Sequence, residues 1–73
     1  MPKLPVLSGS DTCKNLQKFG WRIVRQKGSH IIMVKEGEIV TLSIPNHKEV
    51  AKGTLNSLIK SANLTITEFI EKL

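Results

Sequence analysis

The sequence has 73 residues, an apolar fraction of 40% and a net charge of +5. A chain of this length forms one domain, residues 1–73, with a core too small for a second substrate domain or a large cofactor pocket. It contains no apolar run of about 18 residues that would span a membrane, and no apolar signal segment near its start, so we expect a cytoplasmic protein. Its single cysteine, Cys13, excludes an internal disulfide and a cysteine-rich zinc site.

The first predicted element is a helix over about residues 9–19. Ser8 stands three residues before Asp11, which is the spacing of a helix N-cap with an acidic residue at its third position. Apolar residues then recur at helical spacing, with Cys13 on the apolar side. Gly20 is placed to end the helix by adopting a positive φ.

Three segments rich in β-forming residues come next, separated by short polar turns that contain glycine. Such short connections predict an antiparallel meander. Pro45 should end the sheet because it has no N–H to donate. The expected strands are 21–26, 30–35 and 39–44, with turns at 27–29 and 36–38.

Two helices complete the predicted order α-β-β-β-α-α. After a polar connection over 46–53, apolar residues at helical spacing predict a helix over about 54–62. Thr65 and Glu68 then form a capping box that starts a short last helix. We therefore expect an α+β two-layer domain with helices on one face of a three-stranded antiparallel sheet, similar to the double-stranded-RNA-binding fold. The other sheet face is left open to water or to a partner.

The positive charge is concentrated in the first half of the chain. Residues 1–35 have a net charge of +6, whereas residues 36–73 have a net charge of −1. This asymmetry suggests a polyanionic partner, either nucleic acid or an acidic protein. A surface charge that merely keeps the protein in solution remains an alternative.

His30 is the residue best suited to chemistry. It follows the basic turn Lys27-Gly28-Ser29, and Arg25 lies just upstream. RNA carries its own nucleophile, the 2′-OH, so cleavage requires a base that works near neutral pH and a cation that stabilises the charged phosphorane. Gly28 would let the backbone approach a phosphate closely. The alternative interpretation is an ordinary histidine at the start of a strand.

The remaining candidates are weaker. His47 is most simply a polar residue in a connection, and no ligand cluster beside either histidine predicts a metal site. Lys48 and Lys52 precede the predicted helix over 54–62, where they would bind phosphate or simply be solvated. Trp21 has an aromatic ring on which a base would stack, but a lone tryptophan at a strand start favours the core.

Four stretches that follow one another along the chain stand out as a set. They are Leu7-Ser8-Gly9, Arg25-Gln26-Lys27-Gly28-Ser29-His30, Ile44-Pro45-Asn46-His47, and Gly53-Thr54-Leu55 followed by Ile66-Thr67-Glu68-Phe69. In this order they resemble the HicA toxins, a family of mRNA-cleaving enzymes. The resemblance covers nearly the whole chain without large insertions.

This resemblance implies a toxin of a toxin–antitoxin system, a metal-independent endoribonuclease that acts on mRNA without a cofactor and is inhibited by an antitoxin of the HicB type. It also implies that His30 is the catalytic residue, with Gly28 in the same motif. His47 matches a family position without a clear chemical role, and we expect it to orient the following helix or, as a lesser option, to act as a general acid. Two alternatives remain, a non-catalytic module that binds double-stranded RNA and an inactive toxin relative.

Overall fold

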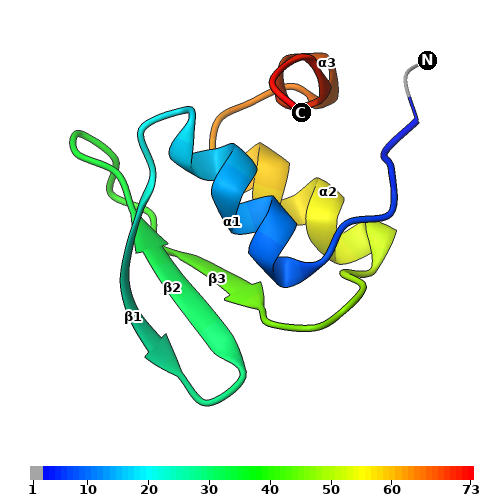
Figure 1. Ribbon diagram of the computed structural model, residues 1–73. Helices are drawn as coiled ribbons and strands as arrows, with labels where there is room; N and C mark the ends of the chain where they lie inside the picture. The colour runs from blue at the N-terminus through cyan, green and yellow to red at the C-terminus, as the bar shows by residue number, and fades with distance from the viewer. Residues whose placement is uncertain (1–2) are drawn as a thin grey trace.

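The computed structural model describes residues 3–73 and confirms the predicted order of elements. A three-stranded antiparallel sheet in the order β1-β2-β3 forms one layer, and three helices form the other (Figure 1). The domain is therefore of the α+β class, with the helices on one face of the sheet. The elements are α1 (Gly9–Gln17), β1 (Arg22–Lys27), β2 (His30–Val34), β3 (Leu42–Pro45), α2 (Lys52–Ser61) and α3 (Ile66–Glu71).

Helix α1 begins and ends as its local sequence predicts. The Ser8 hydroxyl oxygen accepts a hydrogen bond from the Asp11 N–H at 3.0 Å. At the other end, Gly20 has φ +97°, its N–H donates to the Gln17 carbonyl, and the Trp21 N–H donates to the Leu16 carbonyl. This pair of hydrogen bonds is a Schellman motif, which satisfies the last carbonyls of a helix. The regular helix stops at Gln17, and its capping turn continues to Gly20.

Helix α2 ends in the same motif without a glycine. Asn63 has φ +62°, its N–H donates to the Lys60 carbonyl, and the Leu64 N–H donates to the Ile59 carbonyl. Asparagine is the residue other than glycine that most readily adopts this conformation. The capping box of α3 is present as predicted, with the Thr65 hydroxyl and the Glu68 carboxylate each accepting from the other's backbone N–H.

Several element boundaries differ from the sequence predictions. Strand β1 is shifted by one residue, to Arg22–Lys27, and β2 ends at Val34. Pro45 is the last residue of β3, where it pairs with His30, rather than the first residue beyond the sheet. The third strand starts at Leu42 rather than at residue 39. Leu42 pairs with Met33, and β2 ends one residue later at Val34, so residues 39–41 have no strand to pair with. The apolar side chain of Ile39 is fully exposed, at 100%. Helix α2 starts at Lys52 rather than at Thr54, so that Gly53 belongs to its first turn and the preceding connection is shorter than expected.

The core lies between the sheet and the helices. Strand β2 alternates, with Ile31 and Met33 facing the helices, and Trp21 is 2% exposed, which confirms its place in the core. Burial raises the pKa of the Cys13 thiol. The buried apolar residues are Leu7, Cys13, Leu16, Trp21, Ile31, Met33, Leu42, Ile44, Val50, Leu55, Leu58, Ile59, Ala62 and Phe69.

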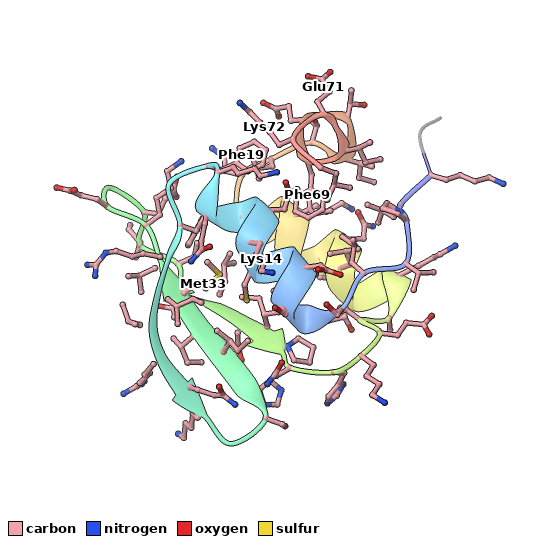
Figure 2. All side chains as sticks on the ribbon, in the orientation of Figure 1. Lys14, Phe19, Met33, Phe69, Glu71 and Lys72 are labelled. Carbon is pink, nitrogen blue, oxygen red and sulfur yellow. The ribbon has the colours of Figure 1, made fainter. Side chains whose placement is uncertain are left out.

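Helix α3 is attached to α1 as well as to α2. The Asn15 side-chain amide donates to the Phe69 carbonyl at 2.8 Å, a buried hydrogen bond between residues 54 positions apart. The rings of Phe19 and Phe69 stack with centroids 6.5 Å apart and planes 8° from parallel (Figure 2). Asn15 is 2% exposed, so this polar residue of α1 belongs to the core. The local sequence of the helix does not predict that an asparagine at this position is buried.

Candidate functional site

His30 is exposed at the end of the β1–β2 hairpin, where it pairs with Lys27 across a two-residue turn. Gly28, the first turn residue, has φ +60°, whereas Ser29 does not have a positive φ. A positive φ at the first position alone is typical of a type II′ turn, which suits a two-residue hairpin and requires glycine there. The Gln26 side-chain amide donates to the Gly28 carbonyl at 3.2 Å. His30 is therefore held by a well-defined turn.

The surface above this turn is open. A Cβ atom added to Gly28 would have no neighbouring atom within 4 Å. Both turn residues and His30 are exposed. An anionic ligand therefore has unobstructed access to the turn backbone and to the imidazole.

The register of β1 with β2 places three cations on the open face of the sheet. Residues paired across antiparallel strands lie on the same face. Because Lys27 pairs with His30, Arg25 with Ile32 and Arg22 with Val34, all three basic residues share the face that carries His30.

A bulge makes this arrangement possible. The register shifts between Ile23 and Arg25, so Val24 is the extra residue in β1. In a regular strand, Arg22 and Arg25 would lie on opposite faces, because side chains alternate with a period of two. The bulge also explains why the sequence of this strand alternates imperfectly. The sequence predicted Arg25 and Lys27 as phosphate-binding residues but not Arg22. The broken alternation of this strand was the sequence feature that could have indicated the bulge, and with it the position of Arg22.

His47 lies at the same end of the sheet as His30, although the two are 17 positions apart. Pro45 pairs with His30, and the Asn46 N–H donates to the Ser29 carbonyl at 2.6 Å. The His47 carbonyl in turn accepts a hydrogen bond of 2.8 Å from the Gly9 N–H. The loop after β3 is thus fixed between the His30 turn and the start of α1.

Gly9 permits this close approach. A Cβ atom there would lie 2.2 Å from the Pro45 carbonyl oxygen and 2.9 Å from the Asn46 Cα atom. No side chain fits at those distances, so only glycine lets the start of α1 touch this loop. The sequence places Gly9 at the first position of the helix, but nothing local to that position indicates the contact.

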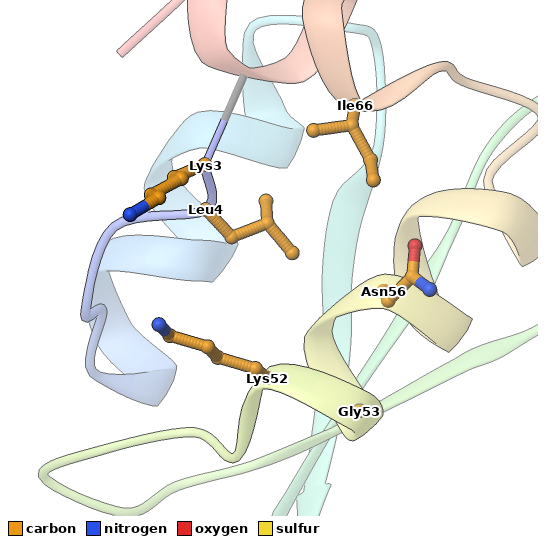
Figure 3. Close-up of a pocket in the computed structure, with 6 residues that line it drawn as sticks. All are labelled: Lys3, Leu4, Lys52, Gly53, Asn56 and Ile66. Atoms are coloured by element: carbon orange, nitrogen blue, oxygen red, sulfur yellow. The ribbon is translucent and has the colours of Figure 1, made fainter. Parts of the chain in front are cut away.

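The two other predicted cations occupy different surroundings. Lys48 is exposed in the bend next to His47. Lys52 begins α2 and lines a pocket of about 470 Å³ (Figure 3), none of whose lining residues belongs to the sheet. The structure therefore groups Arg25, Lys27, Gly28 and Ser29 with His30, and sets Lys52 in a separate place. The pocket is lined by Lys3, Leu4, Lys52, Gly53, Asn56 and Ile66.

Within residues 3–73, no group of three or more histidine, cysteine or acidic side chains is arranged to hold a metal ion. No helix in this described part of the chain is long and apolar enough to cross a membrane.

Comparison with known proteins decides the family. Residues 9–64 match the model of the HicA toxin of bacterial toxin–antitoxin systems. The chain belongs to the HicA toxin family. The HicA match includes both histidines, the glycine turn between β1 and β2, and Gly9.

A solved structure supports the same assignment. A chain of a toxin–antitoxin complex from Streptococcus pneumoniae is 37% identical in sequence to this HicA-family chain, with a TM-score of 0.72. The match covers 80% of this chain and 98% of the Streptococcus pneumoniae chain. No match was found among the curated proteins.

Proposed function

We propose that this HicA-family toxin is a metal-independent endoribonuclease that cleaves mRNA, with His30 as the general base. The observation that carries the proposal is the exposed His30 on one sheet face with Arg25 and Lys27. Membership in a family whose members are generally mRNA-cleaving toxins supports it. An mRNA substrate would place the enzyme in the cytoplasm.

The geometry suits cleavage by the RNA's own 2′-OH. His30 removes the 2′-OH proton, and O2′ attacks the adjacent phosphorus. Arg25 and Lys27 balance the charge that develops on the phosphorane oxygens, and the N–H groups of the Gly28-Ser29 turn contribute at close range. A correctly placed general base contributes roughly 10²–10⁴-fold to the rate. Lys48 contacts a neighbouring phosphate in this scheme, and Lys52 acts only on a more distant part of a bound strand.

The test is cleavage of single-stranded RNA by the purified protein in the presence of EDTA. We expect His30→Ala to abolish cleavage and to leave the circular dichroism spectrum unchanged, because the His30 side chain is exposed. Lys27→Ala should slow cleavage, whereas Lys60→Ala, the same charge change on helix α2, should not. Full activity of His30→Ala would disprove the assignment.

The second candidate is a non-catalytic module that binds double-stranded RNA, or an inactive toxin relative. The basic residues of the open face favour this alternative, since phosphate contacts alone give sequence-independent binding without a role for His30. It predicts binding that weakens with added salt and RNA that stays intact on a gel. An inactive relative would bind its antitoxin tightly and leave RNA uncut.

We further propose that an antitoxin of the HicB type inhibits the enzyme by covering the open face. An acidic partner would neutralise Arg25 and Lys27 and bury His30, and complementary charge would accelerate association. The similar solved chain comes from a toxin–antitoxin complex, which supports a protein partner. A complex that retained full ribonuclease activity would contradict this mechanism.

A further inference from the structure

The structure brings a second histidine, His47, to the end of the sheet that carries His30. Paired Cα atoms of antiparallel strands lie roughly 5 Å apart, and two residues span at most about 7 Å. Because His30 pairs with Pro45 and His47 follows two residues later, the two histidine Cα atoms lie within roughly 12 Å of each other. At this separation of the backbones, both side chains can reach the same phosphodiester group.

The backbone of His47 is fixed, and its side chain is free for a ligand. Its carbonyl accepts the Gly9 N–H, and the preceding Asn46 N–H donates to the Ser29 carbonyl. Both contacts use backbone atoms, so they do not require a histidine side chain at position 47 to hold this loop between the His30 turn and the start of α1. His47 is exposed, and within residues 3–73 neither imidazole takes part in a side-chain hydrogen bond.

The proposed cleavage needs a proton donor as well as a base. When the P–O5′ bond breaks, the departing 5′-oxygen must gain a proton. Histidine is the side chain that exchanges protons near neutral pH, whereas lysine and arginine hold theirs too firmly. The neighbouring Lys48 and the Arg25–Lys27 pair therefore serve as charges rather than as acids.

We propose that His47 is a second catalytic residue, the general acid of RNA cleavage; this inference rests on the proposed function. Neutral His30 takes the proton of the 2′-OH, and O2′ forms a bond to phosphorus. The P–O5′ bond breaks, its electron pair stays on O5′, and protonated His47 gives its proton to that oxygen. The products are a 2′,3′-cyclic phosphate and a 5′-hydroxyl, and the two histidines have exchanged protonation states.

The test compares two RNA substrates that differ in one atom. In the second substrate, sulfur replaces the bridging 5′-oxygen at the cleavage position. A thiolate leaves without protonation, so this substrate does not need a general acid. We expect His47→Ala and His47→Gln to slow cleavage of ordinary RNA by roughly 10²–10⁴-fold and to cleave the sulfur-containing RNA at close to the wild-type rate.

Two control variants complete the comparison. His30→Ala should remain inactive on both substrates, because the base is still required when the leaving group is sulfur. Glu49→Gln, an exposed change two residues from His47, should match the wild type on both. Thermal melts of the His47 variants should match the wild type, because the backbone contacts of this position remain.

The outcomes separate this inference from the proposed function. Wild-type rates for the His47 variants on ordinary RNA, or equal slowing on both substrates, would overturn the role of His47 while leaving His30 as the base. A wild-type protein that cleaves neither RNA would overturn the proposed function and the general acid with it.

Discussion

Replacing Gly9 with alanine tests the contact that links helix α1 to the loop bearing His47. In the structure the new Cβ would lie 2.2 Å from the Pro45 carbonyl oxygen, with the Asn46 Cα at 2.9 Å and the Pro45 carbonyl carbon at 3.1 Å. All these atoms belong to the backbone, so no side chain can rotate away. Helix and loop must separate by at least about 1.2 Å to bring the 2.2 Å approach up to an ordinary van der Waals contact of 3.4 Å.

The size of the effect follows from three contributions. Overpacking a tightly packed site costs about 1–3 kcal/mol. Separation also weakens the hydrogen bond from the Gly9 N–H to the His47 carbonyl, whose net value is about 1 kcal/mol. Replacing glycine in a helix restores about 0.5–1 kcal/mol. We therefore expect Gly9→Ala to destabilise the domain by about 1–3 kcal/mol, which lowers the melting temperature by at least about 4 °C for a domain of this size.

Gly53 provides the matched control. It also lies in the first turn of a helix, but a Cβ there would have no neighbouring atom within 4 Å. Gly53→Ala should therefore raise stability by about 0.4–1 kcal/mol. Urea or thermal unfolding followed by circular dichroism measures both variants. A Gly9→Ala protein as stable as Gly53→Ala would refute the close approach of α1 to this loop.

Three further predictions concern the helices. Asn15→Ala should cost about 1–3 kcal/mol in unfolding free energy, because it removes a buried donor to the Phe69 carbonyl, and hydrogen exchange should show faster opening of α3. Hydrogen bonds from Thr65 lower the pKa of the Glu68 carboxyl. The ionised carboxylate therefore stabilises the fold above the ordinary glutamate pKa, and this stabilisation is lost as pH falls through the lowered value. In acid melts, Glu68→Gln, which keeps the capping bond, should lose stability less steeply than the wild type. Asn63→Gly should raise the melting temperature by a few degrees, because asparagine at φ +62° is less favourable than glycine, and an unchanged or lower value would contradict the left-handed cap of α2.

The fold was largely predictable because its signals are local. The Ser8 cap, the Thr65–Glu68 box and the Gly20 ending each depend on residues within a few positions of one another. The strand order followed from short glycine-containing turns. Local signals failed where a segment had no partner, as at Ile39, whose β-forming side chain stays in solvent because β2 has ended.

The site was predictable only in part. His30, Arg25 and Lys27 stand close together in the sequence, and the hairpin keeps them together on one face. The side of the sheet on which Arg22 lies depends on a bulge that forms only when β1 pairs with β2. Strand pairing is a tertiary event, since its register is chosen by the burial of one face.

By itself, the sequence determined the kinds of element, their order, their caps, and the histidine beside a glycine turn. Only the tertiary structure decided that the loop carrying His47 meets that turn, that Gly9 must be glycine and that Asn15 is buried. These three features depend on contacts between segments that are distant along the chain, and such contacts are specified by packing rather than by neighbouring residues.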